Sequence, residues 1–342
     1  MKSVEVMLIL GVVIGATVLS YAVYQLSLDT IPLLPIGPFH FLIASESAGL
    51  YVFDGNNLSP VDLAPVNLTS SNHLIGADWR HDGSYALIGG THGILLKYDG
   101  RSVERIQTGL NSSTVLYAVS WNSDDSQALI AGSKGIFLVF NGTSVEPIAT
   151  NISETMLAVK WRPDGTKALL SGTNGLVAEY DGGSLTRLPS PVTVSLHDVE
   201  WDPSGSFALI GGSSATILKY DGRILTPLYA LESFGGDPRD AHEIRDITFS
   251  KTTGAALITG AGGYTLWYDK GKFSRTEVFT DLGGNLLDLH QIGDFKAAGW
   301  VEGSLTAFVV GENGVIARVT NMAVTLIHQG ATGIDFRDIV SF

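Results

Sequence analysis

Histidine, carboxylate and arginine side chains gather at a few places in the second half of this 342-residue sequence. They are His197-Asp198, His242-Glu243, Arg245-Asp246, Asp288, His290 and Arg337-Asp338. Imidazole nitrogens and carboxylate oxygens together are able to hold a divalent cation, and the same groups suit a small ligand or a protein partner. Their spacing is typical of no particular metal site, so the identity of any metal stays open.

Three interpretations of this set differ in what its members do. In the first, the aspartates accept hydrogen bonds from the backbone of neighbouring strands and the arginines pair with them, as buried carboxylates require. In the second, the residues form a binding face for a ligand, a metal or a partner. In the third they are catalytic, but the sequence contains no P-loop, G-x-S-x-G, H-E-x-x-H or EF-hand motif that would favour catalysis.

The elements that must position these residues come from a sequence that repeats itself. Residues 157–182 read LAVKWRPDGTKALLSGTNGLVAEYDG, and similar stretches begin at Ile75, Tyr117 and Leu196, with looser copies from Ile244 and Lys296. Each copy is anchored by one aromatic residue: Trp79, Trp121, Trp161, Trp201, Phe249 and Trp300. Their spacings of 42, 40, 40, 48 and 51 residues indicate a repeat architecture.

Each copy predicts four short antiparallel β-strands. An apolar run ends at the anchoring aromatic residue, and glycine-containing turns such as Pro163-Asp164-Gly165 separate the later strands. Asp-Gly and Asn-Gly pairs before the fourth strand, as at Asp181-Gly182, predict tight type I′ hairpins. Four strands in a repeat of this length predict one blade of a propeller, with the aromatic residue buried between neighbouring blades.

The two ends of the repeat region predict how the ring closes. Residues 40–63 match the second to fourth strands of a copy but have no first strand before them. The missing strand is FRDIVSF at 336–342, which aligns with IRDITFS at 244–250. The predicted fold is therefore an all-β, seven-bladed β-propeller of four-stranded antiparallel blades, closed by pairing of the N- and C-terminal strands, which removes an open edge.

The repeat grammar V-x-W-x-P-D-G, A-L-x-x-G and Y-D-G resembles that of the WD-repeat and YVTN-type propeller superfamily. In the later copies, D-I-x-F with G-x-x-G is similar to the photosystem II assembly-factor-like propellers. The resemblance covers residues 40–342 and implies a scaffold rather than a particular activity. The sequence departs from true WD repeats, because Tyr-Asp stands where Trp-Asp would be, so no functional residue is carried over from the family.

Composition narrows the classes of partner. The formal net charge is −13, with 21 Lys and Arg against 34 Asp and Glu, which argues against nucleic acid because such binding needs clustered cations. Zero cysteines exclude a disulfide framework, thiolate metal sites and a cysteine nucleophile. Cationic partners and metal ions remain permitted.

The N-terminal region predicts a membrane anchor. An apolar stretch from Val6 to Leu28 is long enough to span a bilayer as a helix and longer than the core of a usual signal peptide, the alternative interpretation. Lys2 precedes the stretch and the next cation is Arg80, so the N-terminus is expected in the cytoplasm and the propeller outside it. The predicted domains are 1–28 (N-terminus and anchor), 29–39 (Pro-rich extended spacer) and 40–342 (propeller).

Four sequons suggest glycosylation outside the cytoplasm, at Asn67, Asn111, Asn141 and Asn151. The spacer enters the second strand of a blade, so the face with the first-to-second turns is expected to look toward the membrane. The long connections at 234–245 and 281–295 are then expected on the opposite face, and insertions on one face of a repeat array tend to mark its binding side.

These features together predict a single-pass, membrane-anchored extracytoplasmic propeller that acts as a protein-interaction or assembly scaffold and uses no cofactor. Its partner would be a protein of the envelope or of a membrane complex, bound through the face away from the membrane. The alternative is a propeller enzyme, quinoprotein-like or hydrolase-like, with a cofactor or metal over the central channel.

Overall fold

A computed structural model describes residues 40–228, 242–276, 278–287, 292–320, 322–330 and 334–341. The stretch Val6–Leu28 and the spacer lie outside these residues, so the predicted anchor is not tested. In the part of the chain that the structure describes, no helix is long and apolar enough to cross a membrane.

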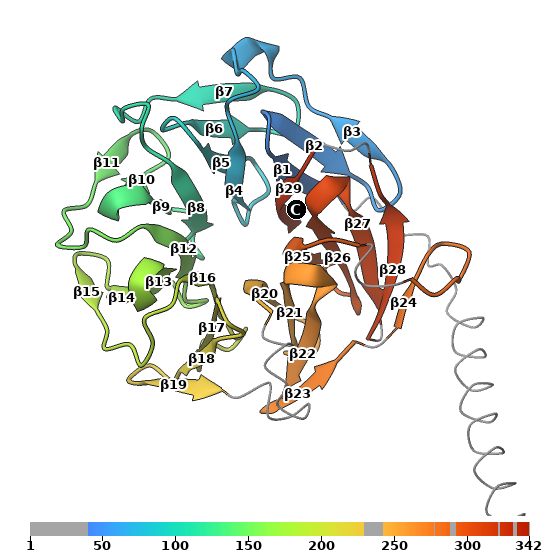
Figure 1. Ribbon diagram of the computed structural model, residues 1–342. Coiled ribbons are helices and arrows are strands. Elements are labelled where there is room, and N and C mark those ends of the chain that lie inside the picture. The colour runs from blue at the N-terminus through green and yellow to red at the C-terminus, as the bar shows by residue number, and fades with distance from the viewer. Residues whose placement is uncertain are drawn as a thin grey trace, which may run out of the picture. The chain divides into compact units, whose positions relative to one another are not determined.

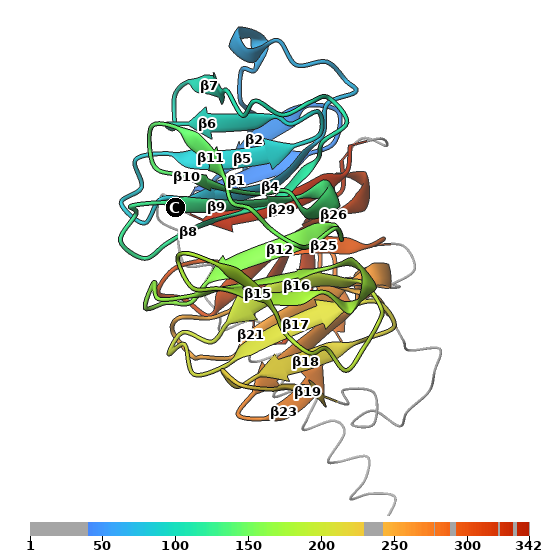
Figure 2. The same ribbon diagram turned by 90° about the vertical axis from the view of Figure 1, so that its left-hand side faces the viewer.

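The residues from His40 to Phe342 form one compact unit built from seven β-sheets arranged in a ring (Figure 1). The innermost strand of each sheet contacts the innermost strands of both neighbours all the way round. The predicted seven-bladed propeller is therefore confirmed, and Figure 2 shows the same ring from its side.

Blade 1 is the split blade, with β29 (Phe336–Ser341) innermost and β1 (Phe41–Ser45), β2 (Gly49–Phe53) and β3 (Leu58–Pro60) outside it. Because Phe41 pairs with Ser341 and Ile43 with Ile339, the last strand of the chain closes the ring against the first. The closure expected from FRDIVSF is thus confirmed.

The other blades follow in chain order from the axis outward, apart from one added strand in blade 7. Blades 2 to 4 are β4 (Leu74–Trp79), β5 (Ala86–Gly90), β6 (Leu95–Tyr98) and β7 (Val103–Ile106); β8 (Leu116–Trp121), β9 (Ala128–Gly132), β10 (Phe137–Phe140) and β11 (Val145–Pro147); β12 (Met156–Trp161), β13 (Ala168–Gly172), β14 (Val177–Tyr180) and β15 (Leu185–Arg187). Blades 5 to 7 are β16 (Leu196–Trp201), β17 (Ala208–Gly212), β18 (Ile217–Tyr220) and β19 (Leu225–Leu228); β20 (Ile244–Phe249), β21 (Ala256–Gly260), β22 (Thr265–Asp269) and β23 (Lys272–Arg275); β25 (Phe295–Trp300), β26 (Thr306–Gly311), β27 (Ile316–Thr320) and β28 (Ala323–His328).

Short 3-10 turns connect some of these strands. They are η1 (Ala64–Val66), η2 (Ser133–Gly135), η3 (Thr173–Gly175), η6 (Ala261–Gly263) and η8 (Glu312–Gly314). We call the face with the second-to-third-strand turns and the inter-blade connections the mouth face. The face with the first-to-second and third-to-fourth turns is the turn face.

Blade 7 departs from the predicted four strands. The short strand β24 (Val278–Thr280), from the connection between blades 6 and 7, pairs in parallel with the outermost strand β28. Phe279 of this strand is buried in the core of blade 7, which explains why three residues hold a position at the sheet edge. No alternating pattern in VFT signals this strand, and its partner lies far along the chain.

The anchoring aromatics are core residues, as expected. Trp79, Trp121, Trp161 and Trp201 are all buried. Trp161 packs edge-on against Tyr180 of its own blade, with ring centroids 5.9 Å apart. Phe137 of the preceding blade packs on the same tyrosine, so the aromatic cluster fills the space between two blades.

The type I′ prediction for the third-to-fourth turns is wrong where an Asp-Gly or Asn-Gly pair opens the turn. At Asp181-Gly182 only the glycine has a positive φ, at 93°, and the aspartate does not. This is the pattern of a type II′ turn, which needs glycine at its first central position alone. The Asp181 carboxylate instead accepts hydrogen bonds from the backbone N–H groups of Gly183 and Ser184.

Candidate functional site

Every innermost strand carries a one-residue bulge near the mouth face. In blade 4, for example, Met156 pairs with Gly172 and Ala158 with Ser171, so Leu157 has no cross-strand partner. The seven bulged residues are Ile75, Tyr117, Leu157, His197, Arg245, Lys296 and Arg337. All are half-buried, and a bulge re-aims its side chain out of the regular alternation.

The bulged residues form two arcs around the axis of the ring on the mouth face. Ile75, Tyr117 and Leu157, from blades 2 to 4, form the apolar arc. The charged arc consists of His197, Arg245, Lys296 and Arg337, from blades 5, 6, 7 and 1. Because all seven share one register position, one face of the ring presents two different surfaces around the same opening.

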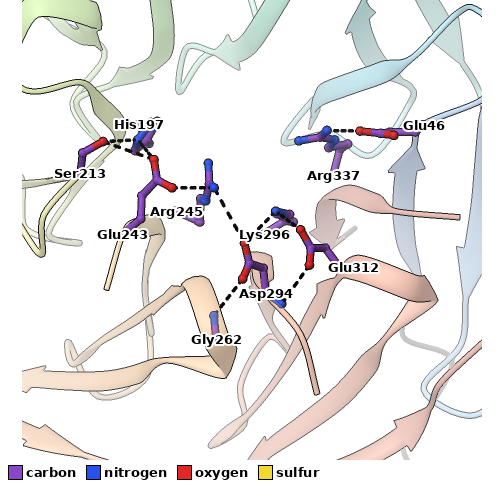
Figure 3. A network of polar contacts seen from close by, with 10 residues as sticks. All are labelled: Glu46, His197, Ser213, Glu243, Arg245, Gly262, Asp294, Lys296, Glu312 and Arg337. Carbon is purple, nitrogen blue, oxygen red and sulfur yellow. Dashed lines mark hydrogen bonds and ion pairs between the residues drawn. The ribbon is translucent and has the colours of Figure 1, made fainter. Parts of the chain in front are cut away.

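A network of ion pairs holds the charged arc (Figure 3). Glu243, at the start of blade 6, lies between two of its members: Oε1 is 2.5 Å from His197 Nε2, and Oε2 is 2.6 Å from Arg245 Nη2. Burial lowers the pKa of His197, against the opposing effect of Glu243. The same arginine nitrogen lies 3.8 Å from Asp294 Oδ2, which links blade 6 to blade 7.

The network continues through blade 7. Lys296 Nζ lies 3.1 Å from Asp294 Oδ2 and 2.8 Å from Glu312 Oε1. Although burial opposes it, the pKa of Asp294 is lowered, because its carboxylate accepts from the N–H of Gly262 and pairs with Lys296. Arg245 and Lys296 are thus each paired with carboxylates of the network.

In blade 1 the last cation of the arc has its own partner. Arg337 pairs with Glu46, and the second oxygen of that carboxylate lies 3.9 Å from His73 Nδ1. Burial lowers the pKa of Arg337.

Below the arc, three aspartates tie neighbouring blades together. Asp198 Oδ2 accepts from Ile247 N at 2.9 Å, Asp246 Oδ2 from Ala298 N at 3.0 Å, and Asp338 Oδ2 from Ala77 N at 2.7 Å. These are the contacts expected from the first interpretation of the set. The arginine half of that interpretation is wrong, because Arg245 and Arg337 pair with the glutamates and Asp294 described above.

Burial raises the pKa of these three aspartates. It reaches about 7 for Asp198, whose neighbour Glu200 adds like-charge repulsion, and about 6 for Asp338. The pKa of Asp246 lies well above its ordinary value for the same reason, with Asp198 and Asp338 as further negative neighbours. These three carboxyl groups therefore lie in a buried, low-dielectric environment that favours their protonated form.

The inter-blade hydrogen bonds that start from blades 2 and 3 lie two residues further along the innermost strand, away from the mouth face. Asp78 Oδ2 accepts from Trp121 N at 2.8 Å, and Ser120 Oγ from Trp161 N at 3.1 Å. Lys160 Nζ lies 2.9 Å from Glu200 Oε2, and this carboxylate raises the pKa of the lysine. Sequence reasoning missed these residues. Aligning the copies at the position directly before the aromatic residue shows a polar or charged side chain in each of blades 2 to 5: Asp78, Ser120, Lys160 and Glu200.

The remaining predicted site residues do not join the network. The His242 ring stacks on Tyr264 with centroids 4.8 Å apart, at the edge of the mouth face. Asp288 and His290 lie outside the described residues, as does most of the connection at 234–245. The four sequon asparagines, Asn67, Asn111, Asn141 and Asn151, are exposed, and their glycosylation stays a prediction.

The chemistry open to this arrangement is recognition rather than proton relay. Ser213 Oγ lies 3.1 Å from His197 Nε2, and Glu243 meets the same nitrogen. A serine–histidine–carboxylate relay needs the two partners on different ring nitrogens, so this trio does not form one. Among the described residues no group of three or more histidines and carboxylates is placed to hold a metal ion.

Comparisons with known proteins agree with the fold. No protein-family model matches the chain, and no curated protein matches it. A solved structure described as YCF48 bound to D1 peptide matches with a TM-score of 0.63 at 15% identity, covering 84% of this chain and 89% of that one. The C-terminal WD40 domain of Sif2 matches with a TM-score of 0.53 at 15% identity, covering 72% and 69%.

The chain is thus a closed seven-bladed propeller similar in fold to YCF48 and to a WD40 domain, and the expected resemblance is confirmed at the level of fold.

Proposed function

We propose that this protein is a membrane-anchored scaffold that holds a segment of a protein partner against its mouth face. The observation that carries the proposal is the division of the mouth into an apolar arc and a charged arc. An arc with an aromatic residue, Tyr117, suits an apolar anchor of the partner, and a polar rim beside it suits hydrogen bonds. A segment crossing the mouth would meet both.

One unpaired donor atom in the charged arc supports the binding of a partner. Arg245 Nε is buried and finds no acceptor among the described residues, although Nη2 of the same guanidinium is engaged twice. Buried donors are nearly always satisfied, so a carbonyl or carboxylate oxygen from outside this part of the chain would complete the arginine. A peptide backbone supplies such oxygens along its whole length.

The fold neighbour also supports a protein ligand, since YCF48 was solved with a peptide bound. We propose no catalytic role and no cofactor for this chain, because the trio of Ser213, His197 and Glu243 lacks relay geometry. The net charge of −13 argues against nucleic acid as the partner.

The anchoring part of the proposal rests on the sequence. Val6–Leu28 would span the membrane with the N-terminus in the cytoplasm, and the propeller would lie outside it. Protease added to intact cells should then cut the propeller loops and spare the N-terminus. Digestion of the N-terminus with protection of the loops would contradict this orientation.

Site-specific photo-crosslinking tests the binding face. A photoreactive phenylalanine placed at Tyr117 in native membranes should give a discrete crosslinked protein, whereas the same group at Gly183, an exposed position on the turn face, should not. Glu243→Gln, which weakens the contacts of His197 and Arg245, should reduce the adduct formed at position 117 while leaving the amount of folded protein unchanged, because glutamine keeps the shape of the side chain and an acceptor oxygen. Equal adducts at both positions, or none at 117, would contradict the proposed face.

A further inference from the structure

The turn face exposes large apolar side chains beside the place where the chain enters the ring. On blade 7, Leu305 precedes β26 with 50% of its surface exposed, and Met322 precedes β28 with 40% exposed. Single exposed apolar residues are ordinary on protein surfaces, so this pair needs a second observation before it means anything.

Met322 is held in a costly backbone conformation. Its φ is 64°, at the position where the corresponding turn of blade 6 has Gly271 with φ 83°. A residue with a side chain is disfavoured in this region, and such outliers persist where they serve a purpose other than local stability. Met322 thus combines this conformation with an unbranched apolar side chain that is 40% exposed.

Three lysines lie on the turn face of the neighbouring blade. Lys251, Lys270 and Lys272 lie on the turns of blade 6, next to blade 7, and all three are exposed. Only Asp269 and Glu302 oppose them among the described turn residues of the two blades. The turns of blades 1 to 4 on the same face have the opposite balance, with Asp54, Asp82, Asp99, Asp124, Asp125, Asp164 and Asp181 against Arg80, Arg101, Arg162 and Lys167.

The chain reaches the ring at the same place. Phe41 opens β1 and pairs with Ser341, at the turn-face end of β29, and β29 packs against β25 and β26 of blade 7. Residues 29–39, between the apolar stretch and His40, span at most roughly 40 Å when fully extended. An anchored chain would therefore keep blade 7 within that distance of the bilayer.

We infer that this sector, Leu305 and Met322 with Lys251, Lys270 and Lys272, rests on the surface of a bilayer that contains anionic lipids. Leucine and methionine would enter the interface, and the lysines would pair with headgroup phosphates, as amphipathic interfacial surfaces do. Attraction between exposed charges fades within about 8–10 Å, so the lysines act only if the sector touches the membrane. This inference rests on the proposed anchoring and fixes which part of the turn face meets the lipid.

The absence of cysteine in the sequence makes a direct test simple. Full-length Leu305→Cys and Met322→Cys variants, each labelled with an environment-sensitive fluorophore, are reconstituted into vesicles of equal parts phosphatidylcholine and phosphatidylglycerol. The matched control is Leu282→Cys, 68% exposed at the outer edge of blade 7 on the mouth face. Lipid-borne nitroxide should quench labels 305 and 322 at least about twofold more than label 282.

Charge is tested in the same system. Replacing Lys251, Lys270 and Lys272 together by Gln, or using phosphatidylcholine alone, should return the quenching at 305 and 322 to the level at 282. Equal quenching at all three positions would overturn the inference. Shielding of labels 305 and 322 from aqueous iodide without quenching from the lipid would also overturn it, because a protein or a second copy would then cover the sector.

Flotation of the same samples separates this inference from the anchor. Protein that floats with the vesicles but shows no lipid quenching at 305 and 322 would overturn the surface contact alone. Protein that does not float would contradict the anchoring and the contact together.

Discussion

The apolar and charged arcs occupy one register position in seven copies of one sequence pattern, yet they share no chemistry. Tyr117 and Arg245 are equivalent residues of blades 3 and 6, and each stands at a bulge without a cross-strand partner. Four residues further on, blades 2 to 7 all have tryptophan or phenylalanine, because this side chain is buried between blades. A bulged, half-exposed residue can be replaced without disturbing the sheet. The sequence of the copies therefore varies at a position that strand pairing and core packing constrain little.

The inter-blade hydrogen bonds below the two arcs differ as well. Behind the charged arc, the inter-blade bonds of Asp198, Asp246 and Asp338 lie directly below the mouth. Behind the apolar arc the same role falls to Asp78 and Ser120, one step deeper. At the upper step Gly76 faces Tyr117 O so closely that an added Cβ would lie 2.2 Å from it, which leaves no room for an aspartate.

The most severe way to break the comparison is to open the ring where the charged arc meets the apolar one. Deleting the last eight residues removes β29, the Asp338 bond and Arg337 together, and exposes the edge of β1. We expect loss of cooperative unfolding, equivalent to several kcal/mol and comparable with the whole stability of an ordinary domain. Thermal unfolding unchanged from the full chain, followed by circular dichroism, would contradict closure by β29.

Equivalent core residues on the two sides test whether the difference is confined to the channel. Trp161 lies behind the apolar arc and Trp201 behind the charged one, 5% and 3% exposed. Each change to Ala should lower the free energy of unfolding by about 3–5 kcal/mol, as large-to-small core changes do. Urea titration should give values within about 1 kcal/mol of each other, and a clearly larger gap would mean that the cores also differ.

Removing one inter-blade bond on each side sharpens the comparison. Asp246→Ala leaves the N–H of Ala298 without its acceptor and should cost about 1–3 kcal/mol, whereas Ser120→Ala should cost about 1 kcal/mol, because the lost acceptor is neutral. Asp246→Asn keeps an acceptor oxygen and serves as the control, with stability near that of the unchanged protein. If Asp246→Ala were as stable as the control, the bond would have no structural role.

The smallest expected effect is a dependence on pH produced by the buried aspartates, three of which lie on the charged side, while burial also raises the pKa of Asp78 behind the apolar arc. The folded pKa of Asp198 is about 7 and that of Asp338 about 6, above the ordinary 3.8, so the folded state binds more protons between about pH 4 and 7. The free energy of unfolding should fall as pH rises through this window, which lowers the melting temperature by roughly 1–3 °C from pH 5 to pH 7.5.

Asp198→Asn should flatten this profile, while Asp78→Asn behind the apolar arc tests whether the effect is general to channel carboxylates. The pKa of turn carboxylates such as Asp181 is lowered, so their titration falls below the window. A melting temperature that rises from pH 5 to pH 7.5 would show that the aspartates are not held in a low-dielectric setting.

The features that recur in every copy could be predicted from the sequence. Anchoring aromatics, turn glycines and the alignment of 336–342 with 244–250 predicted seven blades and their closure, because each copy repeats the same local signals. It was less informative for contacts between an innermost strand and a turn. Glu46 and Glu312, partners of Arg337 and Lys296, lie on second-to-third-strand turns and have no motif that marks them.

The arcs themselves were within reach of the sequence. Reading the residue four places before each aromatic gives Ile75, Tyr117, Leu157, His197, Arg245 and Lys296 in order. What the pattern alone does not show is the bulge, which depends on the register against the second strand and turns that column of residues toward the mouth.

The parallel strand β24 imposes an order of events on folding. Thr280 and Thr325, which face each other across β24 and β28, are 45 positions apart, and all of β25, β26 and β27 lies between them. The segment before blade 7 cannot complete its strand pairing until the last strand of that blade exists, because β24 joins the sheet by pairing with β28. Pairing of β24 with β28 is therefore a late folding step that must close a long loop. Protection of the amides of residues 278–280 from hydrogen exchange would then show that blade 7 is complete.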